Sequence, residues 1–145
     1  MRFLNYAFVL LPSMLWAQEL TVIDYATAFD DLHAFKEKFF NTYPLKPETE
    51  PQEITLVELD YILYQTNSIE APYILISDEA ISIGLSNELA LNLRDDFLNY
   101  FDENCSSGLN YSPEIGSFTE WNCGSAKLSM IQEKQLTMLY IRKEE

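Results

Sequence analysis

Histidine, glycine and cysteine are all scarce in this chain of 145 residues. There is one histidine, His33, beside four glycines and two cysteines. A Ser-His-Asp or Cys-His catalytic set would have to use His33, and no G-x-S-x-G motif surrounds any serine. The glycines form no phosphate-binding loop, and neither H-E-x-x-H nor EF-hand spacing occurs. The sequence therefore predicts no catalytic residue, no cofactor-binding residue and no metal ligand.

Positive charge is also scarce. Nine Lys and Arg residues stand against 23 Asp and Glu residues, which gives a net charge of −14. Fifteen acids and a single base, Arg94, lie between Glu48 and Glu120. Nucleic acids and anionic membranes are bound through Lys and Arg, so both are disfavoured as partners. A basic protein or divalent cations would be attracted, although solubility is the commoner role of such a charge.

The first 17 residues, MRFLNYAFVLLPSMLWA, have the arrangement of a secretory signal peptide. Arg2 precedes an apolar run, and Ala17 supplies a small residue at its end. The run is shorter than the roughly 20 apolar residues of a membrane-spanning helix, and Asn5 and Pro12 interrupt it. We therefore expect export to the periplasm or the extracellular space, with no membrane attachment after cleavage of residues 1–17.

Residues 18–145 have the length of a single small domain with one core. An exported protein meets oxidising conditions, so we expect a disulfide between Cys105 and Cys123. Closing that loop of about 19 residues stabilises the fold by roughly 3 kcal/mol in the chain-entropy model. Two buried free thiols are the alternative. A zinc site is disfavoured because two cysteines and a distant histidine are too few ligands.

Apolar residues recur every three or four positions in residues 24–40 and 87–103, which predicts two amphipathic helices. Asp24 and Ser86 are the expected N-caps. Between these helices, three prolines in residues 43–53 predict a surface connection.

Several segments rich in β-branched and aromatic residues predict strands. Residues 54–64 are expected to form one strand with a bulge near Val57, although the same residues also permit a helix. Residues 73–77 and 81–85 suit a hairpin, with one longer strand as the alternative. At the end of the cysteine loop and after it, the segments SFTEW, AKLSMI and LTMLYIRK predict an antiparallel meander of up to three strands.

Adjacent acidic residues are the only candidates for catalysis. Such pairs include Asp30-Asp31, Asp78-Glu79, Asp95-Asp96 and Asp102-Glu103. Two carboxyl groups can hydrolyse a glycoside when one protonates the leaving group and the other attacks or activates water. Adjacent acids point in different directions, however, and solvated protein faces are built from such residues.

The sequence thus predicts an α+β domain in which two amphipathic helices pack on a mostly antiparallel sheet with one disulfide. We expect an exported, non-catalytic protein that inhibits or neutralises a basic protein. Asp95, Asp96, Glu114 and Glu120 are acids that would steer this partner. The alternatives are a small carboxylate-dependent hydrolase of envelope or extracellular polymer, and a structural envelope domain.

Overall fold

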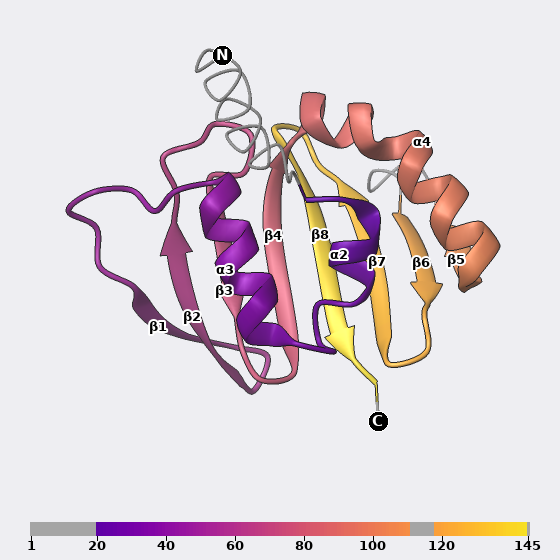
Figure 1. Cartoon of the computed structure of the whole chain (residues 1–145), viewed down its shortest axis with the longest axis horizontal. Helices are drawn as coiled ribbons and strands as arrows, with labels where there is room; N and C mark the ends of the chain where they lie inside the picture. The colour runs from indigo at the N-terminus through magenta and orange to yellow at the C-terminus, as the bar shows by residue number, and fades with distance from the viewer. Residues whose placement is uncertain (1–19, 111–117, 145) are drawn as a thin grey trace, which may run out of the picture.

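The computed structural model describes residues 20–110 and 118–144 as helices on one antiparallel sheet (Figure 1). The predicted signal peptide, residues 1–17, and Glu114 lie outside the described residues. The elements, in order, are α2 (Val22–Ala26), α3 (Leu32–Thr42), β1 (Gln52–Leu56), β2 (Leu59–Gln65), β3 (Tyr73–Ile76), β4 (Ala80–Ser86), α4 (Asn87–Asn104), β5 (Ser106–Asn110), β6 (Phe118–Asn122), β7 (Ala126–Gln132) and β8 (Leu136–Lys143).

The same plan occurs twice along the chain: a helical segment followed by an antiparallel meander of four strands. The sheet order is β1-β2-β3-β4-β8-β7-β6-β5, so the last strands of the two meanders pair at the centre. β4 and β8 run antiparallel over seven residue pairs, from Ala80 with Arg142 to Ser86 with Leu136. The first strands of the two meanders, β1 and β5, are consequently the two edges of the sheet.

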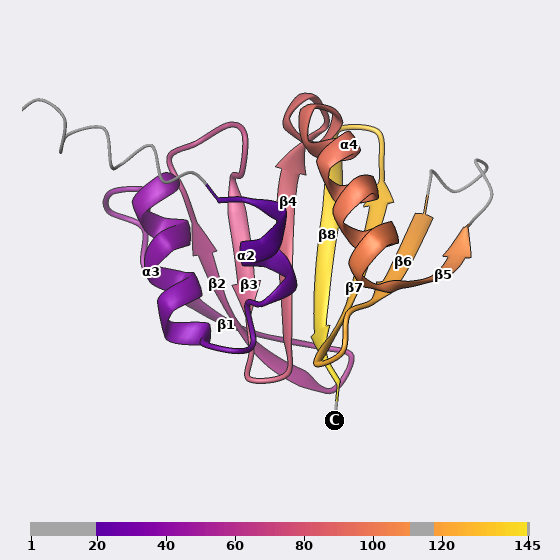
Figure 2. The same ribbon diagram turned by 45° about the vertical axis from the view of Figure 1, so that its right-hand side comes forward.

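The helices cover one face of this sheet (Figures 1 and 2). α3 lies over the first meander, α4 over the second, and α2 between them. Alternate strand residues turn towards the helices, so these residues are the buried ones. The fully buried aliphatic side chains of the sheet are Ile74, Ile81, Ile83, Leu85, Leu128, Leu139 and Ile141. Because these side chains point towards the helices, the core is the space between helices and sheet. Burying each of them contributes about 1.5–3 kcal/mol.

Aromatic rings fill the space below the helices. Phe97 and Phe101 of α4 stack with ring centroids 5.4 Å apart, and Trp121 of β6 lies 4.7 Å from Phe101. Tyr25 of α2 contacts Phe97, with a centroid distance of 5.7 Å. Burial raises the pKa of Tyr25, and the nearby Tyr43 and Asp24 add to the effect. These contacts tie the two helical segments to each other and to the second meander.

The opposite face of the sheet carries tyrosines that lie across small residues. Tyr73 covers Gly84, where an added Cβ would lie only 2.6 Å from the tyrosine ring, and its hydroxyl is 3.0 Å from the Met138 sulfur. Tyr61 is only 5% exposed although no helix among the described residues covers this face. Burial raises the pKa of Tyr61, as does its hydrogen bond with Tyr140. The tyrosines therefore shield part of this face themselves.

The prediction of one helix over residues 24–40 is wrong, because the chain turns between Ala26 and Leu32. The Thr27 hydroxyl donates to the Ile23 carbonyl at 2.7 Å at the end of α2. Asp31 then begins α3 by accepting a hydrogen bond from the Ala34 amide at 3.0 Å. A side chain that binds a backbone amide in this way favours a new helix start over continuation of the old helix.

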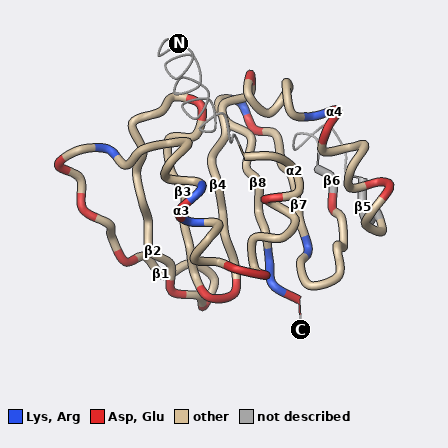
Figure 3. Tube along the Cα trace, viewed as in Figure 1, with Lys and Arg blue, Asp and Glu red and all other residues tan. Residues whose placement is uncertain are grey.

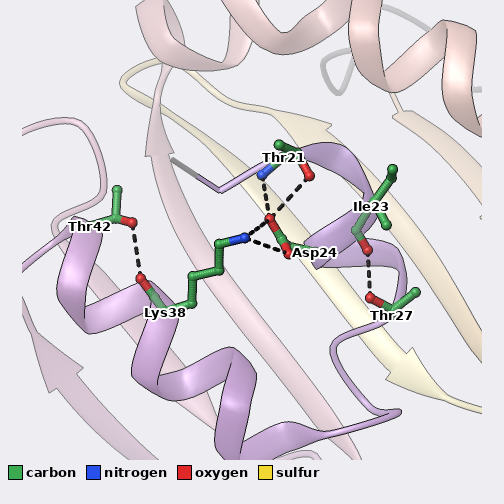
Figure 4. A network of polar contacts seen from close by, with 6 residues as sticks. All are labelled: Thr21, Ile23, Asp24, Thr27, Lys38 and Thr42. Carbon is green, nitrogen blue, oxygen red and sulfur yellow. Dashed lines mark hydrogen bonds and ion pairs between the residues drawn. The ribbon is translucent and has the colours of Figure 1, made fainter. Parts of the chain in front are cut away.

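Asp24 is not the predicted N-cap but lies inside α2 and joins it to α3 (Figure 4). Its Oδ2 accepts a 2.7 Å hydrogen bond from the Thr21 amide, as in a capping box. The Lys38 ammonium of α3 lies 3.0 Å from the same oxygen. The second predicted helix is present as α4, with the Ser86 hydroxyl accepting from the Leu89 amide at 3.0 Å.

The prediction of a single strand over residues 54–64 is also wrong. β1 and β2 form a hairpin whose two turn residues, Val57 and Glu58, have positive φ angles of 46° and 67°. The expected bulge at Val57 is thus a full reversal of the chain, and Leu56 pairs with Leu59. The predicted hairpin of β3 and β4 is confirmed, as is the meander of β6, β7 and β8. β5 was not predicted.

The predicted disulfide between Cys105 and Cys123 is confirmed, with a Cα–Cα distance of 4.5 Å. It joins the end of α4 to the end of β6. Replacing both cysteines with serine should lower the free energy of unfolding by roughly 3 kcal/mol, because the unfolded chain regains the freedom of the loop. Urea denaturation of the double variant and of the wild type under oxidising conditions measures this difference. Equal midpoints would contradict the prediction.

Asp24→Asn tests the link between α2 and α3. Partial burial by itself raises the pKa of Asp24, but the hydrogen bonds from Thr21 and the Lys38 ammonium outweigh it, so the net pKa is lowered. A carboxylate whose pKa is lowered by folding stabilises the folded state at pH values above its unfolded pKa near 3.9. That stabilisation is lost as the pH falls through the folded-state pKa. We expect Asp24→Asn to cost about 1 kcal/mol at pH 7.

Urea midpoints of wild type and Asp24→Asn at pH 7 and at pH 3 measure that dependence. The difference in urea midpoint between the wild type and Asp24→Asn should be smaller at pH 3 than at pH 7. Lys38→Gln is the control, because it removes only the ammonium and leaves the Thr21 hydrogen bonds in place. A difference that does not change with pH would show that the carboxylate is not the stabilising group.

Candidate partner-binding surface

Acidic residues occur in several parts of the molecule, including α4 and the approach to β1 (Figure 3). In the view of that figure several of them follow the loop that leads into β1 and the turns at the lower end of the sheet. Residues 47–93 contain nine acids and no Lys or Arg. The outer edge of the first meander is therefore mainly acidic, with the exposed Lys46 as a base at its start.

We call residues 48–60 the acidic arm, because they hold Glu48, Glu50, Glu53, Glu58 and Asp60 and form the β1–β2 hairpin with its approach. All five side chains are exposed. The ion pairs found among the described residues are His33–Glu37, Lys38–Asp24, Lys127–Glu120 and Lys127–Glu144. None of them uses an acid of the arm. None of these carboxylates therefore forms an ion pair with a base in the part of the chain that the structure describes, although Lys36 lies in the same hollow as Asp60.

The arm lies at the edge of the sheet. β1 is a terminal strand, and four of its five residues are exposed. An edge strand turns half of its backbone N–H and C=O groups to solvent, where another chain can reach them. The carboxylates around β1 would repel any acidic chain at this edge. The arm thus combines an accessible strand edge with negative charge.

Backbone strain coincides with this charge. Three non-glycine residues of the described chain have positive φ angles, namely Glu48, Val57 and Glu58, and all three lie in the acidic arm. A two-residue hairpin turn of this kind normally uses Asn-Gly or Asp-Gly. Val57 is β-branched, so its φ of 46° is a rare conformation. Strained residues of this kind concentrate at functional sites, where the surrounding structure maintains them.

An apolar hollow of about 460 Å³ lies beside the arm. Its apolar lining comes from Ile54 of β1, Leu63 of β2, and Pro72, Tyr73 and Leu75 at β3, and Lys46 also lines it. Strand alternation places the strand residues among them on the sheet face opposite the helices, because Tyr64 turns the other way to contact Phe40. Acids at the edge and apolar side chains behind them give the arrangement of a protein interface, which has a polar rim around an apolar centre.

The acids that the sequence singled out are spread over the molecule. Asp95 and Asp96 are exposed on α4, above the second meander and away from the arm. Glu120 lies 4.0 Å from the Lys127 ammonium, so its charge is partly balanced. Asp102 accepts a hydrogen bond from the Trp121 indole at 3.0 Å, which fixes the end of α4 on β6.

One hollow brings two acids together from distant parts of the sequence. Asp60 and Asp78 line a space of about 280 Å³ between α3 and the ends of β2 and β3, beside Lys36 and Tyr64. Asp60 accepts a 2.7 Å hydrogen bond from the Thr55 hydroxyl. Both carboxylates are exposed, whereas a catalytic acid is normally shielded from water. Within the described residues, no group of three or more His, Cys, Asp and Glu side chains is placed to hold a metal ion.

Val57→Gly should make the protein more stable. Glycine adopts a positive φ without the steric cost that valine incurs there, and the exposed valine side chain contributes little burial. We expect an increase of about 1 kcal/mol in the free energy of unfolding, measured by urea denaturation. Ile69→Gly is the comparison, because Ile69 is similarly exposed but has no positive φ. Ile69→Gly should not increase the stability. A loss of stability in Val57→Gly would contradict the proposal that Val57 is strained at this turn.

Comparison of the chain with protein-family models, with curated proteins and with solved structures found no match. No helix in residues 20–110 or 118–144 is long and apolar enough to cross a membrane. We therefore infer function from the charge, exposure and strain of the acidic arm.

Proposed function

We propose that this chain is an exported, non-catalytic protein that binds a basic protein, as its inhibitor or neutraliser, through the acidic arm. The observation that carries this proposal is the set of five exposed carboxylates on an edge hairpin, none of them in an ion pair with a described residue. The disulfide supports export, because such bonds persist in oxidising compartments. The signal-like N-terminus supports it independently.

The charge of the arm favours a protein among the partners of positive charge. Its acids are spaced along a loop and a hairpin and do not converge on one point, as a cation site would require. The apolar hollow behind Ile54 offers area that a desolvated protein surface can cover. Exposed carboxylates at the rim then act mainly on encounter, by steering a positively charged surface towards the hairpin.

A hydrolase remains the second candidate, and the hollow of Asp60 and Asp78 is the observation that favours it. Glycoside hydrolysis needs two carboxyl groups on either side of one bond, and Asp60 of β2 and Asp78 of the β3–β4 turn line one space. Asp78→Asn separates the two proposals. Loss of polymer hydrolysis in this variant would support the enzyme, whereas it should leave binding of a basic protein almost unchanged.

The binding proposal predicts that the charge of the arm matters more than the charge of the whole protein. The mature, oxidised protein is used as bait in an extract of its own compartment, and association of the retained basic protein is then timed. The arm variant carries Glu48→Gln, Glu50→Gln, Glu53→Gln and Glu58→Gln. We expect it to associate about tenfold more slowly than the wild type at low salt, and the difference should shrink as salt is added.

The matched control neutralises four exposed acids outside the arm, with Glu70→Gln, Asp95→Asn, Asp96→Asn and Glu103→Gln. Its net charge equals that of the arm variant, and none of these acids lies in an ion pair among the described residues. Its association rate should stay close to that of the wild type, so this proposal replaces the expectation from the sequence that Asp95 and Asp96 steer the partner. Equal slowing of both variants would show that association depends on the net charge of the protein and not on the position of the acids in the arm. Retention of no basic protein at either salt would contradict the proposed function.

A further inference from the structure

We propose that the tip of the β1–β2 hairpin, Leu56 and Val57, enters an apolar pocket with a basic rim on the partner protein. This inference rests on the proposed function and names the contact that the acidic arm would deliver. The charge of the arm explains how the two proteins would meet. It does not explain why apolar side chains lie at the end of an acidic hairpin, and this inference does.

The tip exposes more apolar surface than its position requires. Val57 is 93% exposed and Leu56 45%, at the end of a two-stranded ribbon. Two-residue turns at such a place are usually built from Asn, Asp or Gly, which are polar or small and tolerate a positive φ. Valine is neither, so this turn has both an unfavourable conformation and an exposed apolar side chain. Both disadvantages have one explanation if Val57 is buried in a complex.

The acids around the tip define the pocket that would receive it. Glu58 is adjacent to Val57, and Glu53 and Asp60 lie on the two strands that lead to the tip. All three are exposed. An apolar pocket that is surrounded by Lys or Arg would bury Val57 while its rim pairs with these carboxylates. The arrangement matches an interface hot spot, where an apolar anchor is surrounded by polar contacts that exclude water.

The same acids exclude other occupants. A second copy of the chain has a net charge of −14, and its acids would face those of the arm. Nucleic acids and anionic lipid surfaces are repelled for the same reason. A protein with a basic rim is the occupant whose charge fits, and a short hairpin is suited to a concave site such as a cleft.

The experiment compares Val57→Gly with Ile69→Ser, using the basic protein retained by the wild type as the probe. Ile69 is 89% exposed and lies in the loop between β2 and β3, outside the arm. Val57→Gly should weaken the equilibrium affinity about tenfold or more, which is the effect of exposing one buried valine side chain. Ile69→Ser should leave the affinity within about twofold, if surface hydrophobicity as such is unimportant.

Stability provides the second readout, because Val57→Gly should make the isolated protein more stable while it makes the complex weaker. Damage to the fold would lower both quantities, so opposite changes exclude misfolding as the cause of weaker binding. A photoreactive amino acid at position 57 should in addition cross-link to the basic protein, and the same group at position 69 should not.

The outcomes separate this inference from the proposed function. If the arm variant associates slowly but Val57→Gly binds as tightly as the wild type, the tip is not an anchor and the inference is wrong, while the proposed function stands. If Val57→Gly and Ile69→Ser weaken binding equally, the inference is also wrong. If the wild type retains no basic protein, both proposals are overturned together.

Discussion

The pairing of β4 with β8 is the contact on which the rest of the structure depends. Seven residue pairs join the two meanders there, and the side chains that these strands turn towards the helices, among them Ile81, Ile83, Leu139 and Ile141, are fully buried. Without this pairing, each meander would present an open central strand and an uncovered half of the core. Because the two strands are each the last of their meander, joining them sends the first strands, β1 and β5, to opposite edges of one sheet.

The two edges of the sheet differ in covalent linkage and in backbone conformation. Next to β5, the disulfide joins Cys105 at the end of α4 to Cys123 at the end of β6. β1 has no such covalent link, carries exposed residues, and ends in a turn with two positive φ angles. Charge protects an edge strand from pairing with copies of itself, and an acidic edge remains open to a basic chain. The fold thus has one edge secured near the disulfide, and one that is accessible and charged.

The parts of the fold that the sequence predicted are those with strong local signals. α4 has a clear helical spacing after Ser86, and segments with strand composition lie at the end of the cysteine loop, in β6, and after it, in β7 and β8. The break between α2 and α3 was missed because residues 27–31 contain no glycine or proline, and the capping role of Asp31 shows only once its side chain is placed. The turn at Val57 was missed for a similar reason, since its residues are not those that usually make it.

For the candidate surface, composition predicted the acidity and little more. Whether a carboxylate is exposed, and whether a base lies beside it, depends on segments that are distant in the sequence. Glu120 lies near Lys127 across the β6–β7 pair, whereas Glu53 on the opposite edge of the sheet has no described base in an ion pair with it. The alternation of apolar residues shifts between Leu56 and Leu59. This shift, which suggested a bulge near Val57, was the one local sign of a hairpin.

Amide hydrogen exchange of the oxidised protein, with and without the proposed basic partner, tests the central claim most directly. If the acidic arm is the binding surface, protection on binding will be concentrated in residues 48–60, with smaller changes in the neighbouring strands β2 and β3. Protection concentrated on α4 or on the second meander, with residues 48–60 exchanging as in the free protein, would contradict the account.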